Sequence, residues 1–131
     1  MFEVSVTQSF AAAHQLRNYK GKCENLHGHN YKVEVTVEGE ELNNIGLVAD
    51  FVDIKHLMKE VVDRLDHTFL NEMPPFDDWN PSAENIALYF YQQVQSGMER
   101  QGNPPAIARV SQVRVWETDT SVAVYRPPQT K

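Results

Sequence analysis

The order of patterned segments along the chain predicts an α+β protein, in which two pairs of strands flank two helices. Apolar and polar residues alternate in four segments, which is typical of strands with one buried face. In two segments between them, apolar residues recur every three or four positions, as on the buried face of a helix. The expected strands are residues 2–14, 29–40, 109–117 and 121–126, and the expected helices are residues 54–65 and 80–98. We therefore expect a four-stranded antiparallel sheet with both helices on one face.

The ends of these segments carry signals of their own. Asp50 or Asp53 can cap the first helix. Asn80 can cap the second helix, with Pro81 in its first turn. Residues 119–120 separate the last two strands and fit a tight hairpin, although Asp-Thr is a weaker turn signal than Asn-Gly. Four strands also leave open sheet edges, which small proteins often pair with another subunit.

Composition narrows the class of protein. The chain has 131 residues, 41% of them hydrophobic, which suits one globular domain over residues 1–131. No apolar run approaches the ~20 residues needed to cross a bilayer, and no signal peptide is visible at the start. A single cysteine cannot form an internal disulfide, so we expect a cytoplasmic location. With a net charge of −6 and no basic cluster, neither nucleic acid nor a membrane is an expected partner.

Three histidines have positions that suit a shared metal ion. His27 and His29 lie two positions apart, with the parity of the apolar face of the second strand if that strand extends back to them. His14 has the parity of the apolar face of the first strand and can supply a third nitrogen. Three protein ligands with an open fourth position are typical of catalytic zinc sites. A single histidine is more often a packed or surface residue, but three on matching faces favour Zn²⁺ binding.

The other reactive residues each have a functional and a structural interpretation. Cys23 can close a structural zinc site as a fourth ligand, act as a base or nucleophile beside the metal, or be an inert buried thiol. Asp66 and His67 are either an acid–base pair or a polar pair at a helix end. Glu117 can simply end a strand in water, and Glu84 can be an acid near a helix N-terminus.

Five short segments, taken in order, carry a resemblance to a known family. They are SFAAAH at residues 9–14, CENLHGHNY at 23–31, LDHTFLN at 65–71, SAEN at 82–85 and WETD at 116–119. Together they resemble the 6-pyruvoyl-tetrahydropterin synthase and 6-carboxytetrahydropterin synthase family over nearly the whole chain. The resemblance implies the tunnelling fold (T-fold), in which the sheets of three subunits join into a barrel and two trimers form a hexamer.

The same resemblance implies a role for each candidate residue. In the family pattern three histidines bind zinc, a cysteine transfers protons with the help of an Asp-His pair, and two glutamates hold the pterin ring. By position these are His14, His27 and His29 for zinc, Cys23, Asp66 and His67 for proton transfer, and Glu117 and Glu84 for the pterin. Glu117 would anchor the ring, and Glu84 would arrive from across a subunit interface.

The resemblance also implies a substrate, 7,8-dihydroneopterin triphosphate, and several products. The spacing Cys-x-x-x-His-Gly-His over residues 23–29 looks like the bacterial type, which forms 6-carboxy-5,6,7,8-tetrahydropterin and acetaldehyde for queuosine biosynthesis. Glu24 resembles the base of members that form 6-hydroxymethyl-7,8-dihydropterin for folate, and 6-pyruvoyl-tetrahydropterin synthase activity is a further alternative. A zinc- or pterin-binding protein without catalysis is an alternative of another class.

Overall fold

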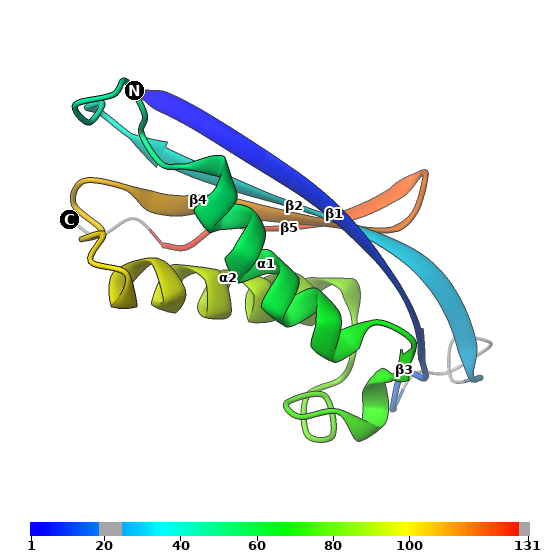
Figure 1. Ribbon diagram of the computed structural model, residues 1–131. Coiled ribbons are helices and arrows are strands. Elements are labelled where there is room, and N and C mark those ends of the chain that lie inside the picture. The colour runs from blue at the N-terminus through cyan, green and yellow to red at the C-terminus, as the bar shows by residue number, and fades with distance from the viewer. Residues whose placement is uncertain (19–24, 129–131) are drawn as a thin grey trace.

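The computed structural model describes residues 1–18 and 25–128 of the chain (Figure 1). Its elements follow the predicted order, with an addition between the two long helices. The strands are β1 (Phe2–His14), β2 (His27–Gly39), β3 (Thr68–Phe69), β4 (Arg109–Thr118) and β5 (Ser121–Tyr125). The helices are α1 (Phe51–Leu65), the short 3₁₀ helix η2 (Leu70–Glu72) and α2 (Ala83–Arg100). The predicted α+β class is confirmed.

The strands form one mixed sheet in the order β3-β1-β2-β4-β5. The neighbours among β1, β2, β4 and β5 pair antiparallel as expected, and residues 119–120 join the last two strands. The expectation of a four-stranded antiparallel sheet was wrong in one respect, because β3 adds a fifth strand that runs parallel to β1 at Ala12 and Ala13. A strand of two residues is too short to show an alternating pattern, so the sequence carries no signal for it.

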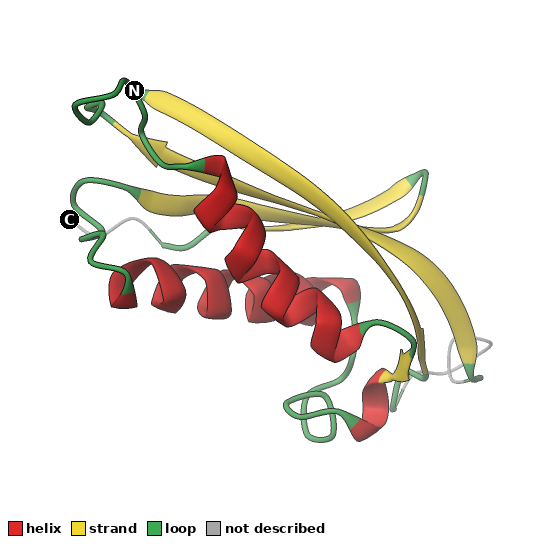
Figure 2. Cartoon of the chain, in the orientation of Figure 1, coloured by secondary structure: helices red, strands yellow, loops and turns green. Residues whose placement is uncertain are grey.

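Both long helices pack against the same face of the sheet (Figures 1 and 2). An aromatic stack lies between the sheet and α2. The ring of Phe10 on β1 is 5.0 Å from that of Tyr31 on β2 and 6.0 Å from that of Phe90 on α2, measured between centroids. Burial of each large apolar side chain stabilises the fold by about 1.5–3 kcal/mol. The stack therefore fixes β1 and β2 over α2, close to the strand ends that carry the histidines.

The two long helices are capped by side chains. Asp50 caps α1, where its carboxylate accepts a hydrogen bond of 2.8 Å from a backbone N–H of the first turn. Ser82 caps α2, where its hydroxyl accepts a hydrogen bond of 3.1 Å from the N–H of Asn85. The expectation that Asn80 caps α2 was wrong, because the Asn80 side chain bonds instead to the backbone of Arg17, just beyond β1.

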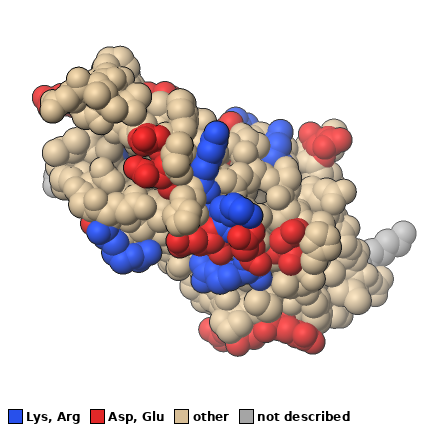
Figure 3. Space-filling model, viewed as in Figure 1, with Lys and Arg blue, Asp and Glu red and all other residues tan. Residues whose placement is uncertain are grey.

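Acidic and basic side chains intermingle on the helical face of the molecule (Figure 3). On α1, for example, Lys59 and Asp63 form an ion pair of 2.9 Å one helical turn apart. Such a mixture of both signs is typical of a face exposed to water. None of the helices in the described part of the chain is both long and apolar enough to cross a membrane.

Gly39 lies at the end of β2, where the chain before β4 passes very close. A Cβ atom at this position would be 2.5 Å from the carbonyl oxygen of Ile107 and 2.6 Å from Val48 Cγ2. We expect Gly39→Ala to lower the free energy of unfolding by about 1–3 kcal/mol, because backbone atoms must move to make room. In Gly28→Ala, the matched control in the same strand, the nearest contact would be 3.7 Å away. Urea unfolding should show a change of less than about 0.5 kcal/mol for this control, and equal effects of both substitutions would contradict the prediction.

Candidate metal centre

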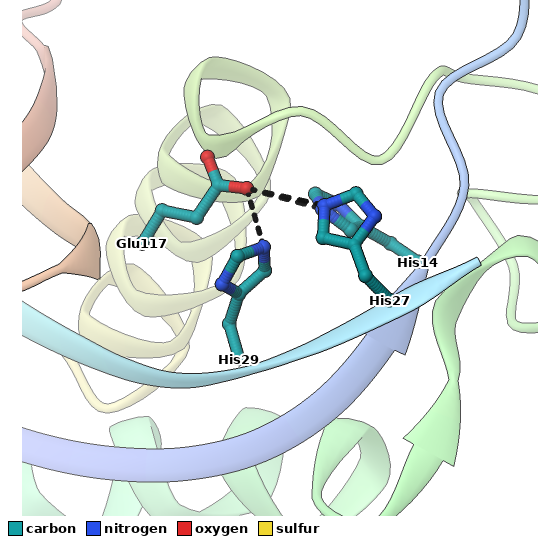
Figure 4. A group of neighbouring side chains, drawn as sticks. All are labelled: His14, His27, His29 and Glu117. Atoms are coloured by element: carbon teal, nitrogen blue, oxygen red, sulfur yellow. Dashed lines mark hydrogen bonds and ion pairs between the residues drawn. The ribbon is translucent and has the colours of Figure 1, made fainter. Parts of the chain in front are cut away.

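Four side chains from three strands converge at one end of the sheet (Figure 4). His14 ends β1, His27 and His29 begin β2, and Glu117 lies near the end of β4. The strand register pairs His14 with His27 and Ala12 with His29, so the three imidazoles come from adjacent positions on the sheet. One possible ligand atom from each of the four residues lies within 4.8 Å of the others. This spacing suits a single metal ion.

Backbone carbonyls fix the protonation of two of the rings. Nδ1 of His14 lies 2.7 Å from the carbonyl oxygen of Pro81, and Nδ1 of His27 lies 2.7 Å from that of Asn25. Because a carbonyl oxygen can only accept, each Nδ1 carries the hydrogen, and in the neutral form of such a ring the lone pair is on Nε2. The two Nε2 atoms face each other at 3.0 Å. When both rings are neutral, two Nε2 lone pairs face each other at this distance, an arrangement that suits a shared cation.

The third imidazole contributes a buried nitrogen, and the carboxylate lies against it. Glu117 Oε1 is 2.8 Å from His29 Nε2 and 3.1 Å from His14 Nε2. Within residues 1–18 and 25–128, His29 Nε2 is nevertheless buried without a hydrogen bond, so its contact with Glu117 is only a close approach. Burial lowers the pKa of His29, against the raising effect of Glu117 and with smaller lowering effects from His14 and His27. Three convergent imidazole nitrogens, one of them buried and without a hydrogen bond in the described part of the chain, fit an ion such as Zn²⁺.

The lowered pKa of His29 predicts a pH effect on the stability of the metal-free protein. In the unfolded chain His29 takes up a proton near its ordinary pKa of about 6.5, whereas in the folded protein it does so only at lower pH. The free energy of unfolding should therefore fall as the pH drops below about 6.5 and level off once the folded site is also protonated.

His29→Gln cannot titrate and should flatten this part of the stability profile. His56→Gln is the control, because His56 lies on the exposed face of α1 with 70% of its side chain accessible. Urea unfolding of the metal-free protein measures how the free energy of unfolding changes with pH. The pH values should run from about 7.5 to about 5, which spans the titration range of histidine. An identical slope for the wild-type chain and His29→Gln would show that His29 is not the source.

Glu117 also lines a cavity of about 250 Å³ beside the cluster. The rest of the wall comes from Ala83 and Glu84 at the start of α2 and from residues 121–124 of β5. A single chain therefore brings both candidate pterin-binding glutamates to one cavity, whereas the family resemblance implied that Glu84 comes from another subunit. Among the described residues, Glu117 forms its ion pairs with the three histidines, and all of them use Oε1. The Glu117 side chain is 30% exposed.

Asp66 and His67 lie at the turn between α1 and β3. Asp66 Oδ2 is 3.0 Å from His67 Nδ1, and Asp66 Oδ1 accepts a hydrogen bond of 2.9 Å from the N–H of Ala11. The hydrogen bond from Ala11 is the main cause that lowers the pKa of Asp66, and His67 adds to it. The ring of His67 is 82% exposed, and its φ of 58° is in the left-handed region, which is uncommon for residues other than glycine.

This Asp-His pair is not part of the four-residue cluster. His67 lines a second cavity, of about 530 Å³, whose wall includes His29 but none of the other three residues of the cluster. Within one chain, the structure thus separates Asp66 and His67 from the convergent imidazole nitrogens. The other two expected catalytic residues, Cys23 and Glu24, lie outside the described residues.

The backbone groups that lie against the rings could not be predicted from the sequence. The carbonyls of Pro81 and Asn25 have no side-chain signature, so no residue pattern could have pointed to them. The contact between Glu117 and the histidines was also not foreseen. A signal for it exists, because the alternation of β4 places Glu117 on the same face as the buried Val113 and Val115.

Comparison with known proteins identifies the family. The sequence model of 6-pyruvoyl tetrahydropterin synthase matches residues 3–128. The chain is 37% identical over 131 residues to 6-carboxy-5,6,7,8-tetrahydropterin synthase of Bacillus subtilis, covering 96% of this chain and 86% of that protein. It is 36% identical over 138 residues to 6-pyruvoyl tetrahydrobiopterin synthase of Homo sapiens, covering 95% of this chain and 90% of that protein.

The fold agrees with these matches. The structure of Caenorhabditis elegans 6-pyruvoyl tetrahydropterin synthase superimposes with a TM-score of 0.84 at 29% identity, covering 97% of this chain and 96% of that one. The chain belongs to the 6-pyruvoyl tetrahydropterin synthase family and has its T-fold. It is an enzyme of the pterin pathway.

Proposed function

We propose that this enzyme converts 7,8-dihydroneopterin triphosphate and water to 6-carboxy-5,6,7,8-tetrahydropterin, acetaldehyde and triphosphate, as a zinc-dependent carbon–oxygen lyase. The observation that carries the proposal is a group of three imidazoles and a carboxylate beside a cavity lined by two glutamates. A cation site and a carboxylate-lined cavity at one strand end suit a pterin whose side chain bears oxygens. Membership of the family supports the substrate class.

In this proposal His14, His27 and His29 hold Zn²⁺ through their Nε2 atoms. When bound, the ion supplies Lewis-acid stabilisation of negative charge on the oxygens of the substrate side chain. The chain itself keeps the rings ready for this role. The Nδ1 contacts of His14 and His27 orient two neutral rings, and burial lowers the pKa of His29.

Glu117 is proposed as the anchor of the pterin ring. A carboxylate can accept two hydrogen bonds, from the amino group and from the ring N–H of a pterin. The cavity of about 250 Å³ that Glu117 lines is smaller than the roughly 300–1,000 Å³ of a typical ligand site, so it suits the ring rather than the whole substrate. The side chain of the substrate would then extend toward the histidines, and Glu84 offers a second acceptor at the wall.

Cys23 is proposed as the base that removes and returns protons, with Asp66 and His67 completing the relay. Because His67 lines a cavity that His14, His27 and Glu117 do not line, we propose that the Asp-His pair serves the site of a neighbouring subunit. The sheet has room for such a neighbour: β5 forms one edge, and at the other edge β3 covers only residues 12–13 of β1. The proposed assembly is a homohexamer, a dimer of trimers whose sheets close into a barrel.

The identity of the product has specific alternatives, because the relatives include both carboxy-forming and pyruvoyl-forming enzymes. Mass spectrometry of the products, with a parallel assay for acetaldehyde, tests it on zinc-loaded protein. We expect 6-carboxy-5,6,7,8-tetrahydropterin and acetaldehyde. Formation of a 6-hydroxymethyl pterin would show the folate-type reaction and indicate Glu24 as the base. Formation of a 6-pyruvoyl pterin would show 6-pyruvoyl-tetrahydropterin synthase activity. Bound zinc without any turnover would refute the proposed reaction.

Substitution of Cys23 tests the proposed base separately from the metal. We expect Cys23→Ala to lower kcat by about 10²–10⁴-fold, the usual contribution of a positioned acid or base, with unchanged zinc content. Glu24→Gln is the matched control at the next position and should change kcat much less. Loss of zinc from Cys23→Ala would instead make Cys23 a metal ligand.

A further inference from the structure

The segment that follows β1 is tied to η2 and to the connection between η2 and α2 by two asparagines, Asn71 and Asn80. Asn71 accepts a hydrogen bond of 2.9 Å from the N–H of Gln15 and donates one of 2.7 Å to its carbonyl. Asn80 makes the same pair of bonds with Arg17, at 2.7 and 2.9 Å. Each side-chain amide therefore pairs with the backbone as a neighbouring strand would, Asn71 from η2 and Asn80 from the end of the connection next to α2.

The guanidinium of Arg17 holds the same connection at three further points. It donates hydrogen bonds to the carbonyl oxygens of Phe76 at 2.7 Å, Trp79 at 3.1 Å and Asn71 at 3.3 Å. A guanidinium carries five donors in a rigid plane, so a single side chain can serve several carbonyls at once. Among the described residues Arg17 forms no ion pair, which leaves the backbone carbonyls as its partners in the structure.

The residue that follows this anchored connection is the one that touches the metal centre. Pro81 comes directly after Asn80, and its carbonyl oxygen lies 2.7 Å from Nδ1 of the buried His14. The chain is also held on the α2 side, where Asn85 donates a hydrogen bond of 2.9 Å to the carbonyl of Asn80. The position of the Pro81 carbonyl is thus set by contacts on both sides of it.

We propose that Arg17 and Asn80 are positioning residues for the metal centre. They hold the Pro81 carbonyl 2.7 Å from His14 Nδ1, which the Tyr31 hydroxyl also approaches at 3.1 Å, and so favour the Nδ1–H form of the ring, with Nε2 toward the ion. The inference deepens the proposed function, because it assigns a purpose at the same site to residues that touch neither metal nor substrate. Loss of an outer-shell partner of a metal-bound histidine typically lowers metal affinity by about 10–100-fold.

Zinc titration of Asn80→Ala against a chromophoric chelator is the first test. We expect its affinity to fall by about 10–100-fold, and that of Arg17→Lys, which keeps the charge but lacks the planar fork, to fall in the same direction. Asn71→Ala is the matched control. It removes an equal pair of hydrogen bonds between the same two segments, but at the end remote from Pro81 along the chain. It should lower the melting temperature as Asn80→Ala does and leave zinc affinity unchanged.

Equal losses of zinc affinity in Asn80→Ala and Asn71→Ala would overturn the inference, because they would reflect general loosening. Unchanged affinity in Asn80→Ala would overturn it too. If Asn80→Ala does not fold, the comparison of Arg17→Lys with Asn71→Ala decides the question.

The second test uses no metal. Long-range ¹H–¹⁵N spectra of the metal-free protein report which ring nitrogen of His14 carries the hydrogen. We expect the Nδ1–H form in the wild-type chain and in Asn71→Ala, and a mixture of both tautomers in Asn80→Ala. A pure Nδ1–H form in Asn80→Ala would refute the positioning role. Failure of the wild-type chain to bind Zn²⁺ would instead refute the proposed function, and the tautomers would still decide this inference.

Discussion

Replacement of His29 by alanine should abolish stoichiometric zinc binding, and with it the activity. The wild-type chain should bind a single ion at the cluster. Among the described residues, His29 Nε2 is the imidazole nitrogen that is buried without a hydrogen bond, so we expect an ion to be its partner and its loss to lower zinc affinity strongly. The loss of affinity should exceed the about 10–100-fold that follows loss of an outer-shell partner. Equilibrium dialysis followed by metal analysis measures both stoichiometry and affinity.

Thermodynamic linkage gives an independent measurement of the same prediction. Free zinc at about one hundred times its dissociation constant should raise the free energy of unfolding of the wild-type chain by about 2.7 kcal/mol. The same concentration should leave His29→Ala unchanged, whereas the control His56→Ala should respond as the wild type does. A His29→Ala protein that still binds a full equivalent of zinc would exclude His29 from the metal site.

The second large effect is expected at Glu117, where Glu117→Gln should raise the KM for the pterin substrate and leave zinc content unchanged. Glutamine keeps the shape of the side chain but replaces one acceptor oxygen by a donor. A hydrogen bond to a charged group contributes about 1.5–3 kcal/mol, which corresponds to about 10–150-fold in affinity. Steady-state kinetics and binding of a substrate analogue measure the effect.

Glu84→Gln is the matched control for this substitution. Glu84 lines the same cavity as Glu117, but it is not among the four residues of the cluster, so its replacement should raise KM less and leave zinc alone. Loss of zinc from Glu117→Gln would make this carboxylate a metal ligand, since its Oε1 lies 2.8 Å from His29 Nε2. An unchanged KM would likewise remove Glu117 from the role of anchor.

The long periodic elements of this fold could be predicted from the sequence because each has one buried face. The apolar stripe predicted between Ile54 and Leu65 is the buried face of α1. It consists of Ile54, Leu57, Met58, Val61, Val62 and Leu65. Short or long-range features could not be predicted in this way. Strand β3 is only two residues long, and its place beside β1 depends on the end of α1. Asn80 and Ser82 are both good caps, and only the distant backbone of Arg17 decides between them.

The candidate site shows the same division. The parity of His14, His27 and His29 along their strands is a local property, so the sequence alone was enough to bring the three imidazoles together. The orientation of the rings depends on carbonyl groups far away along the chain, which carry no residue signature. Asp66 and His67 lie outside the four-residue cluster within one chain, where Asp66 accepts a hydrogen bond from the N–H of Ala11, and their role in proton transfer stays a prediction.

The neutral rings of His14 and His27 have a consequence for the electric field of the molecule. An uncharged imidazole does not reduce the charge of an ion that it binds, so a divalent ion would bring a charge of +2 to the strand end. The carboxylate of Glu117 would lower this local charge to +1 while it lies against the ion. The chain as a whole carries a net charge of −6. A polyphosphate would therefore be repelled by the net charge of the chain and attracted toward an ion bound at this end of the sheet. Such a field would guide an anionic substrate before any contact forms, and its effect on the association rate would weaken as salt is added.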